Sequence, residues 1–165
     1  MLNSQKITPC LWFDNQAEDA ANFYTAIFPN SRIVHISRYG EAGQEVHGQQ
    51  PGTVMVVAFE LEGQEFTALN GGPLFQFNEA ISFQISCENQ QEVDHYWEKL
   101  SEGGDPTAQQ CGWLKDKYGV SWQVIPKVLL ELLNSSDQEK AGKAMNAMMQ
   151  MKKFDIQQLE HAYNG

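Results

Sequence analysis

The sequence predicts an α+β fold built from two βαβββ modules followed by a helical tail. An internal repeat is the main observation, because the stretch from Ile7 to Glu18 aligns with the stretch from Ile81 to Glu92. In each copy an alternating apolar run leads through an Asn-Gln turn into a helical pattern, and further strand-like runs follow. The 165 residues suffice for about one domain of roughly 150 residues. We therefore expect a single domain over 1–165, with modules at about 7–70 and 81–126 and a tail at 127–165.

The first module begins with the strand that contains Ile7 and continues with a helix over about 16–28. Apolar residues recur in this helix at helical spacing, and Pro29 ends it. Asn15 is expected to cap the helix start, with Glu18 three residues on as the acid of a capping box. Strands are expected at about 32–39, 53–62 and 65–70, with a turn around Gly63.

The second module repeats this order in a shorter form. Asn89 and Glu92 are the expected capping pair of a helix over about 90–102, which Gly103 and Gly104 end. Strands are expected at about 107–112, 113–117 and 120–125, with a turn at Tyr118 and Gly119.

The tail carries methionines at helical spacing. Met145, Met148, Met149 and Lys152 follow three- and four-residue steps, which places a methionine-rich stripe on one helix face. We expect this stripe to pack against the body of the protein or against a second subunit.

Composition excludes several classes of partner. Eleven Lys and Arg residues against 21 Asp and Glu give a formal charge of −10, which opposes binding to nucleic acid or to anionic membranes. No stretch approaches the roughly 18 apolar residues of a spanning helix, and the start of the chain lacks an apolar signal core. We therefore expect a cytoplasmic protein. Cys10, Cys87 and Cys111 have no metal-binding spacing and are interpreted as reduced structural thiols.

Four segments show a resemblance that spans nearly the whole chain: ITPCLWFDNQAEDAANFYTAIFPNS, VDHYWEKLSEGG, CGWLKDKYGVSWQVIP and KAMNAMMQMKKFDIQQLEHAY. They resemble the PhnB-like family of the vicinal-oxygen-chelate superfamily, which includes glyoxalase I, bleomycin-resistance proteins and extradiol dioxygenases. This family often carries the label 3-demethylubiquinone-9 3-methyltransferase. The resemblance implies a mixed sheet curled around a cavity, and a homodimer.

Alternation along the first strand of each module predicts which side chains face that cavity. Ile7, Leu11, Phe13, Ile81, Phe83 and Ile85 are expected to face the helices. The opposite positions are Thr8, Cys10 and Trp12 in the first module and Ser82, Gln84 and Ser86 in the second. On the last strands, matching FTALN and SWQVI to the family pattern places Ala68 and Gln123 toward the cavity. The expected ligand-binding residues are Thr8, Cys10, Trp12, Ala68, Ser82, Gln84 and Gln123, with aromatic surface from Phe66, Trp113 and Tyr118.

The superfamily holds a divalent metal with His and Glu side chains at four of these positions, which the resemblance places at Thr8, Ala68, Ser82 and Gln123. If the first alignment slips by one residue, Pro9 replaces Thr8. None of these residues is an acid or a histidine, so we expect no metal and no cofactor. His35 is the only histidine on an expected strand. It is interpreted either as a hydrogen-bonded structural residue or as the best single candidate for proton transfer.

Two classes of function remain open. The first is a small-molecule-binding protein of the glyoxalase/bleomycin-resistance type with a metal-free cavity, in which Trp12 and Gln123 either line the cavity or fill the core. The second is an enzyme, either a metal-assisted isomerase, lyase or dioxygenase with non-standard ligands, or the demethylubiquinone methyltransferase of the family label. No glycine-rich turn leads from a strand into a helix, which speaks against the usual binding site for a methyl donor.

Overall fold

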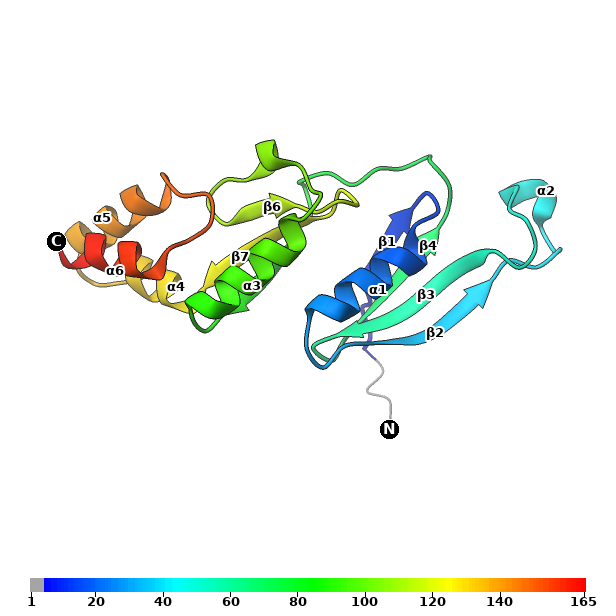
Figure 1. Ribbon diagram of the computed structural model, residues 1–165, viewed down its shortest axis with the longest axis horizontal. Coiled ribbons are helices and arrows are strands. Elements are labelled where there is room, and N and C mark those ends of the chain that lie inside the picture. Colours follow the sequence, from blue (N-terminus) through cyan, green and yellow to red (C-terminus); the bar gives the residue numbers. More distant parts are fainter. Residues whose placement is uncertain (1–4) are drawn as a thin grey trace. The chain divides into compact units, whose positions relative to one another are not determined.

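The computed structural model describes residues 5–165 and divides them into two compact units, 5–77 and 78–165. The architecture is α+β, as predicted, with two mixed sheets and helices at the C-terminal end (Figure 1). The strands therefore form two separate sheets and not the one curled sheet expected from the resemblance. No helix within residues 5–165 combines the length and hydropathy that a membrane crossing requires.

The first unit contains a four-stranded sheet in the order β1-β4-β3-β2. Its strands β1 and β4 run parallel, and the other neighbours run antiparallel. Helix α1 covers one face, where Tyr24 of the helix and Val57 and Phe59 of β3 are almost fully buried. The elements are β1 (Cys10–Phe13), α1 (Ala17–Ile27), β2 (Arg32–Arg38), the short α2 (Gln44–His47), β3 (Val54–Leu61) and β4 (Gln64–Asn70).

The start of helix α1 is capped by a residue of β4, which lies far away in the sequence but next to the helix in space. The helix begins after Gln16, whose side chain makes no capping hydrogen bond, so the expected cap at Asn15 is wrong. Instead the Ala17 N–H donates to Asn70 Oδ1 at 2.8 Å, and Asn70 Nδ2 donates to Val54 O. Asn70 is buried at the end of β4, and it thereby ties the helix start to the sheet.

The second unit contains a three-stranded sheet in the order β5-β7-β6, with α3 on one face. Asn89 caps α3 as predicted, since its Oδ1 accepts from the Glu92 N–H at 3.0 Å. The Glu92 carboxylate in turn accepts from the Glu88 N–H. The elements are β5 (Phe83–Cys87), α3 (Gln90–Ser101), β6 (Trp113–Lys115) and β7 (Ser121–Pro126).

The expected strand over 107–112 does not form. A 3-10 turn, η1 (Pro106–Ala108), stands there instead, and Asp105 caps it by accepting from the Thr107 N–H. Farther on, Cys111 and Gly112 adopt φ values of +48° and +79°, which are incompatible with an extended strand. The second module is therefore one strand shorter than predicted.

The tail forms three helices that belong to the second unit: α4 (Lys127–Leu133), α5 (Gln138–Met148) and α6 (Ile156–Asn164). Leu129, Phe154 and Leu159 make a buried cluster, and Met148 packs against it. Met145 and Met149 are exposed, at 42% and 52%. The predicted methionine stripe is thus divided, because α5 ends at Met148 and the chain turns there.

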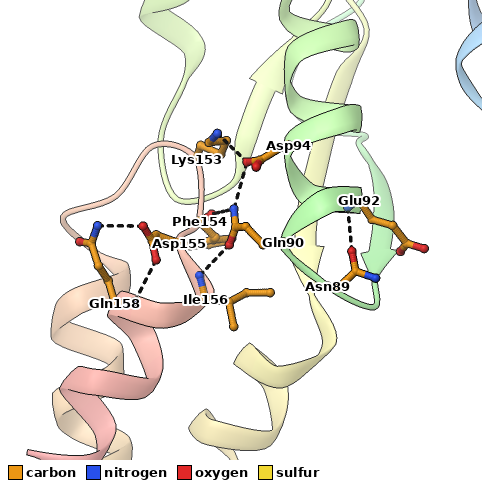
Figure 2. A network of polar contacts seen from close by, with 9 residues as sticks. All are labelled: Asn89, Gln90, Glu92, Asp94, Lys153, Phe154, Asp155, Ile156 and Gln158. Carbon is orange, nitrogen blue, oxygen red and sulfur yellow. Dashed lines mark hydrogen bonds and ion pairs between the residues drawn. The ribbon is translucent and has the colours of Figure 1, made fainter.

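A polar network fixes the tail to α3 (Figure 2). The Gln90 side chain donates to Asp94 Oδ1 and to Phe154 O, and accepts from the Ile156 N–H. Lys153 Nζ lies 2.6 Å from Asp94 Oδ1. These bonds, first from Lys153 and then from Gln90, hold the pKa of Asp94 below its usual value. Nearby, the Cys111 and Gly112 N–H groups donate to the carbonyls of Met151 and Lys152, so the tail is an integral part of the second unit.

Candidate ligand-binding site

Three of the predicted site residues meet on the face of the second sheet that α3 does not cover. Gln84 on β5 lies opposite Gln123 on β7 in the strand register. Gln84 Nε2 donates to Gln123 Oε1 at 3.4 Å, and Gln123 Nε2 donates to Ser82 Oγ at 2.8 Å. We call Ser82, Gln84 and Gln123 the amide cluster. Because all three are neutral, they offer a ligand hydrogen-bond donors and acceptors without charge.

An aromatic ring lies beside the amide cluster. Trp113 on β6 pairs with Gln123 in the register, so both side chains project from the same face, and Trp113 is half-buried. Trp122 has the opposite orientation. It is buried in the core, and its indole Nε1 donates to Asp116 Oδ2 at 2.8 Å. The open face of the second sheet therefore combines an aromatic surface with neutral polar groups.

The first sheet also has a face that α1 does not cover. The strand register places Cys10, Thr67, Ala58 and His35 in one row across its four strands. The neighbouring row consists of Trp12, Leu69, Val56 and Ser37. Strands lie about 4.8 Å apart, so Cys10 and His35 at the two ends of their row are roughly 14 Å apart. They do not form a thiol–imidazole pair, although both are exposed.

The expected orientation of Ala68 is wrong. Ala68 is fully buried and pairs with Leu11 and Val57, both of which are buried on the side of α1. Phe66 is on the same side and stacks on Phe59, so it also belongs to the core. Alternation within β4 places Thr67 on the open face instead.

The strand registers show how the two modules correspond. In the first module Cys10 pairs with Thr67, and in the second Gln84 pairs with Gln123. Thr67, and not Ala68, is therefore equivalent to Gln123. Burial along β4 agrees with this equivalence, because Phe66, Ala68 and Asn70 are buried while Thr67 and Leu69 between them are half-buried.

The first residues of the two modules precede the strands. Ile7 and Ile81 were expected to face the helices, but they are 84% and 74% exposed. The strands begin only at Cys10 and Phe83, so strand alternation does not apply at these earlier positions. Thr8 lies before β1 and is half-buried.

Trp12 on the first sheet's open face is fixed by the segment that follows β4. Its indole Nε1 donates to Gly72 O at 2.9 Å, and its ring meets the Phe75 ring edge-on with centroids 5.0 Å apart. A Cβ added to Gly71 would lie 2.2 Å from the Trp12 ring. The indole therefore needs a glycine at position 71.

Replacing Gly71 with alanine is expected to displace the Trp12 ring and to lower the free energy of unfolding by about 1–3 kcal/mol. The Trp12 indole N–H signal in an NMR spectrum should shift strongly, because its hydrogen bond to Gly72 is disturbed. Gly40→Ala is the matched control, since nothing lies within 4 Å of a Cβ there. An unshifted indole signal in Gly71→Ala would contradict the described packing.

The residues present do not fit the divalent metal that the resemblance implies. The equivalent positions carry Thr8, Thr67, Ser82 and Gln123, which supply hydroxyls and one neutral amide. Divalent transition metals bind imidazole, carboxylate and thiolate groups far better. Within residues 5–165, no group of three or more His, Cys, Asp or Glu side chains is placed to hold a metal ion.

The three thiols differ in their surroundings. Cys87 is fully buried, and burial, with a smaller effect of Glu92, raises the pKa of its thiol to about 12. Its thiol is therefore protonated at neutral pH, as expected of a structural cysteine. Cys111 is half-buried with its Sγ 3.6 Å from Met148 O, and Cys10 is exposed on the first sheet.

Comparison with known proteins identifies the family. Residues 5–125 match the family described as 3-demethylubiquinone-9 3-methyltransferase. The PhnB protein of Bacillus cereus, described by the same activity, is 42% identical, with a TM-score of 0.63 over 74% of this chain and 99% of its own. No curated protein matches the sequence.

More distant structures share the fold alone. A protein from Pseudomonas aeruginosa is 19% identical, with a TM-score of 0.56 over 74% of this chain and 98% of its own. The fosfomycin resistance protein FosX from Mesorhizobium loti is 14% identical, with a TM-score of 0.54 over 80% of this chain and 98% of its own. The chain therefore belongs to the 3-demethylubiquinone-9 3-methyltransferase (PhnB) family.

Proposed function

We propose that this protein binds a small, neutral, partly apolar organic molecule without the help of a metal ion. The observation that carries the proposal is the amide cluster of Ser82, Gln84 and Gln123 beside the Trp113 ring. After their mutual hydrogen bonds, the Ser82 hydroxyl proton, one N–H of each glutamine and Gln84 Oε1 remain for a ligand. A flat molecule with oxygen acceptors would contact both the ring and these groups.

A buried hydroxyl beside the cluster supports the proposal. Ser121 lies two residues before Gln123 on β7, so the two side chains project from the same face. The Ser121 side chain is 2% exposed, and its Oγ has no hydrogen-bond partner within residues 5–165. An unpaired buried hydroxyl costs about 1–3 kcal/mol. A ligand removes this cost only if the side chains that cover Ser121 move aside and admit its polar atom.

Three further expectations from the sequence stay predictions. They are a ligand-binding cavity, the homodimer and the cytoplasmic location. In the first module by itself, Thr8, Cys10 and Trp12 stay predicted ligand contacts, Thr67 takes the place of Ala68, and His35 stays the candidate for proton transfer.

Methyl transfer is the second candidate, because the family description names it. The turns that lead from strand to helix consist of Asp14, Asn15 and Gln16 in the first module and of Glu88 and Asn89 in the second. Neither contains the glycines that usually bring a backbone close to a nucleotide-like donor. A calorimetric titration with S-adenosylmethionine is expected to give no saturable binding. Saturation in the micromolar range would favour the methyltransferase.

Metal addition provides the test of the metal-free site. Thermal unfolding with Mn²⁺, Ni²⁺, Zn²⁺ or Fe²⁺ is expected to show no increase in stability, because the amide cluster supplies no anionic ligand. A site filled at a hundred times its Kd would stabilise the fold by about 2.7 kcal/mol. A stabilisation of that size, lost in Gln123→Leu, would contradict the proposal. Gln91→Leu, an exposed glutamine on α3, is the matched control.

A further inference from the structure

We propose that the tail carries a second binding site, for a neutral aromatic nitrogen heterocycle, in the depression between α5 and α6. The depression is formed by residues 147–161, beyond the residues 5–125 that match the family. It is also separate from the amide cluster, so it does not depend on the function proposed above.

The depression has a suitable size and a fixed frame. It is an open surface depression of about 550 Å³, large enough to hold a single small ring. Its lining consists of Ala147, Gln150, Met151, Gln157, Gln158 and His161. Helix α6 is held at its start by the Asp155 cap and by the hydrogen bond from the Ile156 N–H to Gln90 (Figure 2). The side chains on α6 therefore project from an anchored helix.

The floor of the depression suits an aromatic ring. Ala147 and Met151 form its apolar part, and both pack against the buried cluster of Leu129, Phe154 and Leu159. The methionine thioether makes favourable contacts with aromatic rings at about 5 Å. A flat ring on this floor would cover apolar surface that is now open to water.

The walls suit a neutral ring with both donors and acceptors. Gln150, Gln157 and His161 are exposed, and their side chains make no hydrogen bond to protein within residues 5–165, whereas Gln158 Nε2 donates to Asp155 Oδ2. A glutamine amide can make two parallel hydrogen bonds to adjacent ring and exocyclic nitrogens, as in adenine recognition. The lining contains no Lys, Arg, Asp or Glu, so nothing there favours a phosphate or an ammonium group.

NMR titration of the isotope-labelled full chain with adenine and with nicotinamide tests the site. At least one of the two is expected to give saturable shifts at Met151, Gln157 and His161, with Kd on the order of 0.1–1 mM for so small a ligand. Indole, which has a donor but no ring acceptor, should bind at least about tenfold more weakly. Adenosine monophosphate should bind no more tightly than adenine.

Two variants locate the binding. Gln157→Leu and His161→Leu should each weaken binding about three- to tenfold, the value of one hydrogen bond or ring contact. Glu160→Gln is the control, since Glu160 lies between these residues in sequence but outside the depression. Absence of saturable shifts with both heterocycles, equal binding of indole, shifts centred on the amide cluster, or equal weakening in the control would each overturn the proposal.

Discussion

Replacing Phe154 with alanine is expected to lower the free energy of unfolding of the second unit by about 3–5 kcal/mol. The Phe154 ring is 2% exposed and forms a buried cluster with Leu129 and Leu159, which lie on α4 and α6. Its backbone is held by Gln90, so the cavity cannot close by a small shift of the tail. Chemical denaturation followed by circular dichroism measures the change.

Three further variants accompany this measurement. Phe154→Leu, which keeps most of the buried volume, should cost clearly less than Phe154→Ala. Gly112→Ala should also be destabilising, because a Cβ there would lie 2.4 Å from the Phe154 ring and 2.9 Å from Val124 O. Deletion of residues 143–165 removes Phe154 and Leu159 together, and aggregation or dissociation is expected. An unchanged unfolding curve in Phe154→Ala would show that the tail does not contribute to the fold.

Replacing Asp116 with alanine should have an effect of similar size. The carboxylate is 2% exposed and accepts three hydrogen bonds in the turn between β6 and β7. The donors are Trp122 Nε1 at 2.8 Å, the Tyr118 N–H at 2.9 Å and the Val120 N–H at 3.0 Å. Alanine leaves these donors without their acceptor, at a cost of about 1–3 kcal/mol for each one that stays buried, so we expect a total of about 3–5 kcal/mol.

The Asp116→Asn variant separates the effect of losing the hydrogen-bond acceptors from the effect of losing the negative charge. One amide oxygen still accepts from the two backbone N–H groups, but the NH₂ group then faces the Trp122 indole N–H. The loss of stability should therefore be smaller than in Asp116→Ala. Equal stability of wild type and Asp116→Ala would contradict the hydrogen bonds described for this turn.

The sequence predicted most elements because local signals determine them. Asn89 and Glu92 supply their own capping interactions, and the turn at Glu62 and Gly63, both at positive φ, sets the β3–β4 hairpin. The cap of α1 was missed because its acceptor, Asn70, belongs to a strand far along the chain. The missing strand at 107–112 has the same kind of cause, since this segment is paired with tail residues Met151 and Lys152.

The candidate site was predictable in the second module, where the alternation of side chains along the strands gives a single orientation for each residue. Ser82, Gln84 and Gln123 were expected on one face, and the structure joins them by hydrogen bonds. Ala68 was misplaced because its orientation was taken from a family pattern, whereas the structure buries it together with Phe66 and Asn70. The tail depression was not predictable, because it depends on how α5 and α6 pack.

Native mass spectrometry of protein purified without chelator tests most directly whether neutral side chains hold an organic ligand here. The account predicts a small molecule retained by the wild type and by Gln91→Leu, reduced or lost in Gln123→Leu, with no divalent metal in stoichiometric amount. A stoichiometric metal ion, or equal retention of the molecule by Gln123→Leu, would contradict it.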